Sequence, residues 1–201
     1  NGVDVDVLRP GDRAEARARL GLADGPLVVC VGRICQAKGQ DVLVETWPRV
    51  TGRVPDARLV LVGDGEDAEK VRKAAGDGIV FAGQREDAAD WLAAANVVVA
   101  PSRWEGMSFA MLEAMAAARS VVITDVPGAR DALGQDSAAI VPLGDRRALQ
   151  RLAEKHDAVA IDDAERAVLA APERLQAQGV GLLHVTRRVD FVVQDHQRTL
   201  V

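Results

Sequence analysis

Two glutamates eight positions apart, Glu105 and Glu113, are the residues whose types and spacing point most directly to chemistry. Glu105 stands in a turn beside Gly106, and Glu113 is the one acidic residue in the apolar run 109–116. A buried carboxylate is costly unless something hydrogen-bonds it, so a ligand is one candidate partner for Glu113. Ionised carboxylates here can accept hydrogen bonds from sugar hydroxyls at Glu105 and from a vicinal diol such as ribose at Glu113. Taken singly, an exposed loop acid and a solvent-facing helix acid are the more ordinary interpretations.

The segment between the two glutamates has the features of a helix start. Ser108 is a suitable N-cap for a helix that begins near residue 109. Such a start leaves backbone N–H groups free near Gly106, Met107 and Ser108, and free N–H groups at a helix start favour phosphate or sugar oxygens. A capped helix start is common, so this feature supports a ligand site only together with the two acids.

A second candidate site is the loop that contains Gly32, Arg33, Lys38 and Gly39. A glycine directly after a strand lets the backbone approach a ligand, and two cations on one loop can clasp a diphosphate. An ordinary solvated loop with two surface cations explains the same spacing equally well. The loop has neither the GxGxxG pattern of dinucleotide-binding proteins nor the P-loop pattern GxxxxGK[ST]. We interpret the Gly63-Asp64-Gly65 segment as a tight turn.

Composition narrows the class of protein. The 201 residues are 48% hydrophobic and 27% charged, enough for one sizeable core. The net charge of −5 argues against nucleic-acid binding. No apolar run approaches the roughly 20 residues that span a bilayer, and we recognise no signal peptide, so we expect a soluble, cytoplasmic protein. Two cysteines, Cys30 and Cys35, are too few for a disulfide framework and lack metal-type spacing, so we expect buried or idle thiols and no metal site.

Short β-branched runs alternate with helical patterns along the first 145 residues. The expected strands are 27–31, 58–62, 79–81, 97–100, 121–124 and 138–141, and the expected helices begin near 41, 67, 88 and 109. A turn is expected at Pro127-Gly128. Strands that are apolar on both faces predict an α/β fold: a Rossmann-like parallel sheet of about six strands with helices on both faces. In such a sheet the candidate residues follow the carboxyl ends of strands and gather on one rim, where ligands bind.

The remainder of the chain, residues 146–201, has a different character. It predicts a helical tail over 146–155, 162–178 and 185–199 that packs on the same domain. The histidines His156, His184 and His196 all fall in this tail, where solvated or capping roles are more ordinary than catalysis. The chain opens on Asn1-Gly2-Val3-Asp4, which is a turn sequence, and we expect that it is a fragment of a longer protein.

Several short motifs in order resemble the donor-binding half of glycosyltransferase family 4, the retaining, nucleotide-sugar-dependent enzymes of the GT-B fold. The resemblance covers roughly residues 1–145 and is weaker in the tail. Each motif alone is modestly specific, but their order and spacing together are hard to obtain by chance. The motifs lie at residues 32–41, 59–65, 81–83, 96–106, 112–115 and 124–128. Ala118 and Ser120 depart from the Gly and Pro that many relatives have, and Cys35 occupies a position that is usually small or polar.

The resemblance implies roles for individual residues. Arg33 and Lys38 would contact the donor diphosphate and stabilise its charge as the sugar departs, assisted by Gly32 and by the N–H groups of Gly106, Met107 and Ser108. Glu105 would hold hydroxyls of the transferred sugar, and Glu113 the nucleotide ribose. Gln84 and Arg85 would lie against the base. The catalytic set would thus be Arg33, Lys38 and Glu105.

The resemblance also implies partners. The donor would be a UDP- or GDP-linked sugar, with no metal ion and no separate cofactor, and fixed cations and amides would supply the charge stabilisation. An N-terminal acceptor-binding domain, absent from this chain, would complete the enzyme and carry any membrane association, so the chain alone would be inactive. Two alternatives remain open: a non-enzymatic nucleotide-binding or regulatory module on the same fold, and another GT-B enzyme such as a sugar phosphorylase or epimerase.

Overall fold

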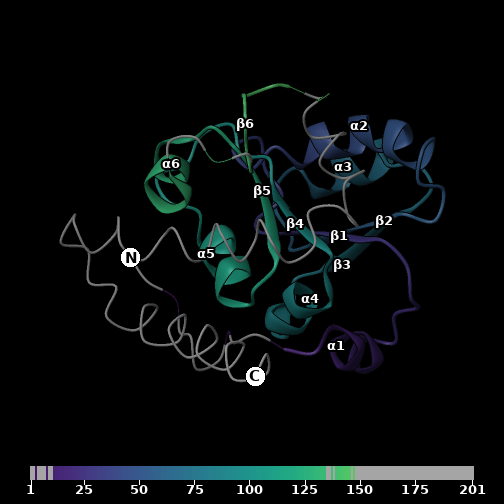
Figure 1. Cartoon of the computed structure of the whole chain (residues 1–201). Helices are drawn as coiled ribbons and strands as arrows, with labels where there is room; N and C mark the ends of the chain where they lie inside the picture. Colours follow the sequence, from purple (N-terminus) through teal and green to yellow (C-terminus); the bar gives the residue numbers. More distant parts are fainter. Residues whose placement is uncertain are drawn as a thin grey trace, which may run out of the picture.

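The architecture is a six-stranded sheet whose strands alternate with helices along the chain (Figure 1). A computed structural model describes residues 11–134, 137, 139–145 and 147, together with residues 3 and 8. The strands are β1 Leu27–Val31, β2 Arg58–Val62, β3 Ile79–Gly83, β4 Val97–Ala100, β5 Ser120–Thr124 and β6 Ile140–Val141. The helices are α1 Arg13–Leu20, α2 Gln40–Thr51, α3 Ala68–Ala74, α4 Ala88–Ala94, α5 Phe109–Ala116 and α6 Pro127–Leu133.

The strand order is β3-β2-β1-β4-β5-β6, and every neighbouring pair is parallel. This order confirms the predicted α/β fold with a Rossmann-like parallel sheet. The chain first builds outward from β1 to β3 and then crosses back to β4 on the other side of β1. The point between β1 and β4, where the order reverses, is where ligands bind in open parallel sheets.

The core has two layers, one on each face of the sheet. Side chains alternate along β1, so that Leu27 and Val29 belong to one buried cluster and Val28 and Cys30 to the other. This double burial explains why the strands read as continuous apolar runs rather than as alternating patterns.

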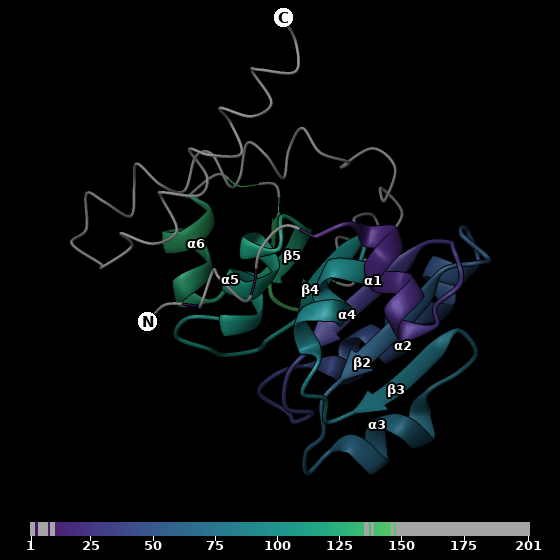
Figure 2. The same cartoon turned by 90° about the horizontal axis from the view of Figure 1, so that it is seen from below.

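Helices cover both faces, as the sequence predicts. Side chains of α2 and α3 fill one cluster, and those of α1, α4, α5 and α6 fill the other. Figures 1 and 2 show α2 and α3 on one side of the sheet and α1, α4 and α5 on the opposite side. The crossover from β3 to β4 through α4 therefore lies on a different face from α2 and α3.

Two helices differ from the expectations drawn from the sequence. Helix α1 was not predicted, although Asp12 caps it by accepting a hydrogen bond from the Glu15 N–H at 3.0 Å and Gly21 ends it with a φ of 65°. The predicted turn at Pro127-Gly128 was wrong, because these residues form the first turn of α6. Proline suits the first helical position, where its missing N–H has no partner to lose.

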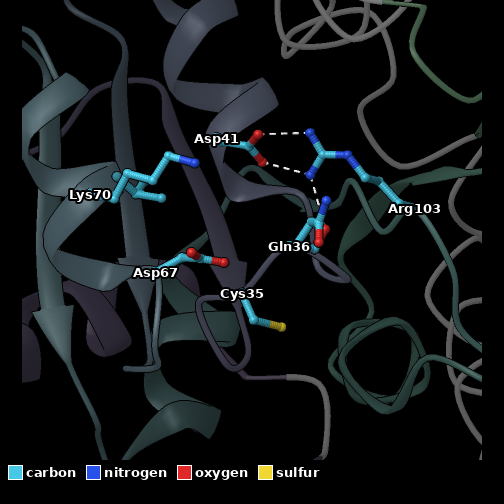
Figure 3. Close-up of a pocket in the computed structure, with 7 residues that line it drawn as sticks. Cys35, Gln36, Asp41, Asp67, Lys70 and Arg103 are labelled. Carbon is cyan, nitrogen blue, oxygen red and sulfur yellow. Dashed lines mark hydrogen bonds and ion pairs between the residues drawn. The ribbon is translucent and has the colours of Figure 1, made fainter.

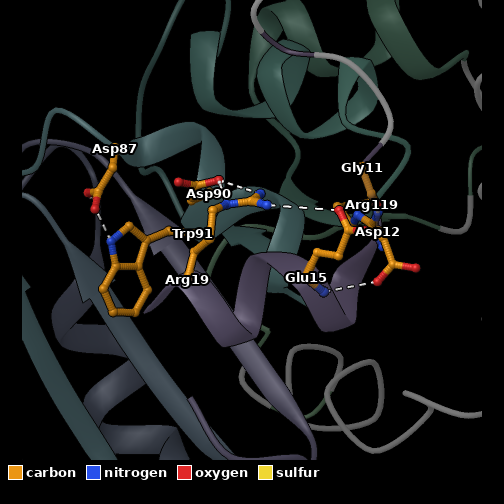
Figure 4. A network of polar contacts seen from close by, with 8 residues as sticks. All are labelled: Gly11, Asp12, Glu15, Arg19, Asp87, Asp90, Trp91 and Arg119. Atoms are coloured by element: carbon orange, nitrogen blue, oxygen red, sulfur yellow. Dashed lines mark hydrogen bonds and ion pairs between the residues drawn. The ribbon is translucent and has the colours of Figure 1, made fainter. Parts of the chain in front are cut away.

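Polar contacts tie α1 to the rest of the molecule (Figure 4). Arg19 donates two hydrogen bonds to Asp90 Oδ1 in α4, at 3.0 and 2.7 Å. Arg17 is only 7% exposed and donates to the Ala94 carbonyl at 3.1 Å and to Asn96 Oδ1 at 2.7 Å. Arg119 donates to the carbonyl of Gly11 just before α1, at 2.6 Å. These contacts attach α1 to the α4 side of the sheet.

The predicted tail over 146–201, with its three histidines, lies almost wholly outside the described residues. Residue 138, the first residue of the last predicted strand, also lies outside them, and the described part of that strand is Ile140–Val141. Among the described residues, none of the helices has the length and apolar character required to cross a bilayer.

Candidate functional site

The candidate residues lie on loops that follow neighbouring strands at one edge of the sheet. The loop 32–39 leaves β1, and the loop 101–108 leaves β4, and these two strands pair directly in the middle of the sheet. Both loops therefore meet at the point where the strand order reverses. Adjacent parallel strands bring together residues that are about 70 positions apart in the sequence.

Lys38 and Glu105 are in direct contact across these two loops. The Lys38 ammonium forms an ion pair with Glu105 Oε1, and the Glu105 side chain is only 11% exposed. Ser102 Oγ donates to the other carboxylate oxygen, Oε2, at 2.9 Å. Glu105 is thus held at both oxygens, while the described residues engage only one of the three N–H groups of the Lys38 ammonium.

Buried hydroxyls hold the Glu105 loop in position. Ser102 and Ser108 are each 1% exposed. Thr124 at the end of β5 donates a hydrogen bond to the Ser102 carbonyl. Ser108 Oγ accepts from the Met111 N–H at 3.3 Å, which confirms Ser108 as the N-cap of α5. The start of α5 thus points toward the same edge of the sheet as Glu105, with N–H groups that have no partner within the helix.

Glu113 lies in the second turn of α5 and is half-buried. Within the described residues, no side chain forms an ion pair or hydrogen bond with its carboxylate. Burial therefore raises its pKa above the ordinary value of 4.5. Within the described part of the chain, both oxygens of this half-buried carboxylate are therefore available to accept hydrogen bonds, and its role toward a ligand stays a prediction.

Arg33 follows Gly32 and pairs with a different acid from Lys38. Its side chain is 70% exposed, and its Nε donates to Glu66 Oε2 at 2.9 Å. The pKa of Glu66 is lowered, first by its own backbone N–H and then by Arg33. Lys38 therefore pairs with Glu105, whereas the long side chain of Arg33 lies on the loop surface and pairs with Glu66.

Gln84 and Arg85 follow β3, at the same edge of the sheet but two strands from β1. Both are exposed. Arg85 donates to the two oxygens of Asp87 at 2.8 and 2.6 Å, and this interaction lowers the pKa of Asp87. The guanidinium of Arg85 is therefore engaged on its own loop rather than directed at Lys38 or Glu105.

Residues that the sequence did not single out connect the two loops. Arg103 forms a two-point ion pair with Asp41 at the start of α2, at 2.8 and 2.7 Å. Gln40 is 2% exposed and donates to the Arg33 carbonyl at 2.9 Å, while its Oε1 accepts no hydrogen bond from the described residues. No spacing rule links residues 41 and 103, so only the strand order could have identified the pair.

A cavity of about 260 Å³ adjoins this ion pair (Figure 3). Its lining comes from the loops after β1 and β4 and from the starts of α2 and α3, and comprises Cys35, Gln36, Asp41, Asp67, Lys70, Val71 and Arg103. The described part of the chain contains no cluster of three or more His, Cys, Asp or Glu side chains that could hold a metal ion.

A family model described as "Glycosyl transferases group 1" matches residues 25–156 of the 201. The chain belongs to this family. The match includes both loops, the α5 start and the second glutamate, and it confirms the resemblance on which the residue roles were predicted. The chain is therefore a member of the group 1 glycosyltransferases with the GT-B type of parallel sheet.

Curated relatives in the group 1 family are glycosyltransferases. A "GDP-mannose-dependent alpha-(1-6)-phosphatidylinositol monomannoside mannosyltransferase" of Mycobacterium tuberculosis is 36% identical over 83% of this chain and 47% of its own length. A "D-inositol 3-phosphate glycosyltransferase" of Segniliparus rotundus is 34% identical over 92% of this chain and 42% of its own length. The chain spans about half the length of the curated relatives it matches.

Solved structures share the fold. The Anabaena protein Alr3699/HepE, in complex with UDP, superposes with a TM-score of 0.75 at 20% identity over 97% of this chain and 56% of its own. The C-terminal domain of the group 1 protein LpcC from Francisella tularensis gives a TM-score of 0.68 at 23% identity, over 88% of this chain and 97% of that domain. At these identities the similarity concerns the fold alone.

Proposed function

We propose that this chain is the nucleotide-sugar-binding half of a retaining glycosyltransferase. One observation carries the proposal: the loops after β1 and β4, the strands at which the sheet order reverses, join Lys38 to the nearly buried Glu105. Lys38 can bind a diphosphate and Glu105 can bind a sugar hydroxyl, and the two residues lie together at the position where open parallel sheets bind ligands. Membership of the group 1 family supports the same function.

The donor is a nucleoside diphosphate sugar, and GDP-mannose is the first candidate. Relatives that are GDP-mannose-dependent match 83% of this chain at 36% identity, which supports a guanine base and a mannosyl group. The free carboxylate oxygens of Glu113 suit the two hydroxyls of a ribose, because each oxygen can accept one hydrogen bond. Gln84 and Arg85 remain our candidates for contact with the base.

The transfer itself breaks the bond between the sugar C1 and the diphosphate oxygen and forms a bond between C1 and an acceptor hydroxyl on the same face. Lys38, Arg33 and the N–H groups at the start of α5 stabilise the negative charge that develops on the departing diphosphate. The acceptor proton passes to a phosphate oxygen, and Glu105 keeps the sugar oriented through its hydroxyls. For Arg33, this role requires a change of partner from Glu66 to the diphosphate.

The acceptor site belongs to a second domain, in this proposal. The relatives are about twice as long as the segment that this chain matches, which supports a partner domain of similar size. We therefore expect the 201-residue chain to bind donor without transferring sugar.

Calorimetric titration of the chain with GDP, UDP and ADP tests this function. We expect one of the three, first of all GDP, to bind with a clear preference, and Glu113→Ala to weaken it because the ribose contacts are lost. Glu69→Ala is the matched control, since Glu69 is an exposed helix acid that pairs with Lys73. Failure of a correctly folded chain to bind any of the three diphosphates would contradict the proposal, as would equal losses in the two variants.

A further inference from the structure

The loops after β1 and β4 touch along their backbones as well as at Lys38 and Glu105. The Arg103 N–H donates to the Ala37 carbonyl at 2.8 Å. Gly39 has a φ of 71°, and a side chain there would overlap the Pro101 carbonyl oxygen. Glycine is thus required at this point, where the backbones of the two loops lie against each other.

The guanidinium of Arg103 spans the same junction. Its Nη1 donates to the Gln36 carbonyl at 2.9 Å and to Asp41 Oδ1 at 2.8 Å, and its Nη2 donates to Asp41 Oδ2 at 2.7 Å (Figure 3). One side chain from the β4 loop therefore fixes both ends of the β1 loop segment that contains Lys38. The fork of an arginine can make this paired contact with a carboxylate, whereas the ammonium of a lysine cannot.

We propose that Arg103 and Asp41 form a latch that positions Lys38 against Glu105, so that the two loops present one preformed diphosphate and sugar site. The inference rests on the proposed function and adds two positioning residues to it. Arg103 acts through the loops rather than as a ligand of the diphosphate, because three of its five N–H donors, including both that face Asp41, are engaged by Asp41 and Gln36. Ser102, next to Arg103 in the same loop, completes the arrangement through its hydrogen bond to Glu105.

The surroundings of Arg103 support a positioning role for Arg103, as distinct from the diphosphate-binding role of Lys38. Asp41, Glu45 and Asp67 all act electrostatically on Arg103, and together they raise its pKa, with the Asp41 hydrogen bond as the largest cause. The latch side chains are 28% exposed for Arg103 and 41% for Asp41, less than those of the surface pair Arg33 and Glu66. Three acids thus offset the positive charge of Arg103, which favours a structural role for its guanidinium over the binding of an anion.

Two variants of the 201-residue chain test the latch by hydrogen exchange, which needs no ligand. Arg103→Met keeps most of the side-chain length and removes the fork. We expect amide exchange in segments 36–41 and 102–106 to rise about tenfold or more, the usual effect of losing a hydrogen bond to a charged group. Arg19→Met is the matched control, because it breaks an arginine–aspartate pair between α1 and α4. Unchanged exchange in both segments of Arg103→Met would overturn the latch.

Titration of Arg103→Met, Asp41→Asn and the double variant with GDP and with guanosine separates positioning from direct contact. We expect Arg103→Met and Asp41→Asn each to weaken GDP about tenfold while guanosine binding changes little, and the double variant to be no worse than either single one. If Arg103 bound the diphosphate directly, Asp41→Asn would free it and strengthen GDP binding, which would overturn the inference. If the wild-type chain bound no diphosphate, this result would contradict the proposed function but not the latch. The latch is tested separately by hydrogen exchange, which needs no ligand.

Discussion

At the scale of single residues, the ionised carboxylate of Glu113 lowers the stability of the fold, and the same group is our candidate for binding the ribose. Burial raises the pKa of its carboxyl, so between pH 4.5 and the higher folded value the native state binds more protons than the unfolded state. The free energy of unfolding therefore falls as the pH rises through that window. Glutamine at this position removes the charge and keeps the shape of the side chain.

We predict that Glu113→Gln is more stable than the wild-type chain at pH 7, by up to about 1 kcal/mol, and that the difference disappears below pH 4.5. Urea unfolding at a series of pH values measures both effects. Glu69→Gln, at an exposed helix position, should give no such pH-dependent gain. A Glu113→Gln variant whose relative stability does not vary with pH would show that burial does not raise the pKa of this carboxyl.

The two cysteines should differ sharply in reactivity. Cys30 lies inside β1, and burial raises the pKa of its thiol to about 12, so about one molecule in ten thousand carries the thiolate at pH 8. Cys35 is partly exposed beside the cavity. We predict that a thiol reagent modifies only Cys35 in the native chain and both cysteines in urea. Peptide mapping after labelling checks this, and labelling of Cys30 in native Cys35→Ser would contradict it.

The sequence singled out candidate binding residues, but it did not single out the residues that hold them in place. Glu105 and Lys38 could be singled out because their types and local context point to sugar and phosphate oxygens. Arg103 and Asp41 look like ordinary surface charges in the sequence, and they become partners only because β1 and β4 are neighbours. The predicted clasp of Arg33 and Lys38 joined two residues of one loop, whereas the structure pairs each with an acid from a different loop.

At the scale of elements, the loops of the site depend on close backbone contacts. Gly128, in the first turn of α6, lies against the loop that contains Glu105: a Cβ atom there would overlap the Gly106 carbonyl oxygen and lie 2.8 Å from the Met107 Cα. Both obstructing groups belong to the backbone and cannot rotate away. Helix α6 therefore supports the segment that carries the proposed donor contacts.

We predict that Gly128→Ala lowers the free energy of unfolding by about 1–3 kcal/mol, the usual cost of overpacking, and also weakens GDP binding by displacing the loop. Gly76→Ala is the control, because a Cβ atom there meets nothing within 4 Å. Urea unfolding and titration of both variants test the prediction. Equal stability of the two variants would mean that α6 does not support the loop at this point.

Elements with strong apolar runs were predictable, and the short amphipathic ones were less so. The strands 27–31, 58–62 and 97–100 agree with β1, β2 and β4 because double burial demands continuous β-branched residues. Helix α1 escaped prediction because its sequence is dominated by arginine and alanine, and its buried residues are Ala16 and Arg17. Arginine is normally exposed, so a hydrophobic pattern does not indicate the packing of Arg17 against the Ala94 carbonyl.

At the scale of the whole molecule, the fold class followed from the alternation of strands and helices, and the location of the site followed from the fold class. The order of the strands in the sheet could not be predicted from the sequence, although the rule of right-handed crossovers restricts the possible strand orders. The observed order divides the sheet into two units, β1 to β3 and β4 to β6, with the candidate site at their junction. A ligand that contacts both loops therefore connects the two units of the sheet.

We predict that GDP stabilises the whole described domain as one unit. At 100 times its dissociation constant, a ligand specific for the native state adds about 2.7 kcal/mol, and the unfolding temperature should rise with the logarithm of its concentration. Because the site joins both units, hydrogen exchange should slow in β2 and in β5 together, and unfolding should remain a single transition. Guanosine, which lacks the phosphates, should give a smaller shift because it does not engage Lys38. Protection confined to one unit would mean that the ligand contacts only one of the two loops, and the junction would then not be the donor site.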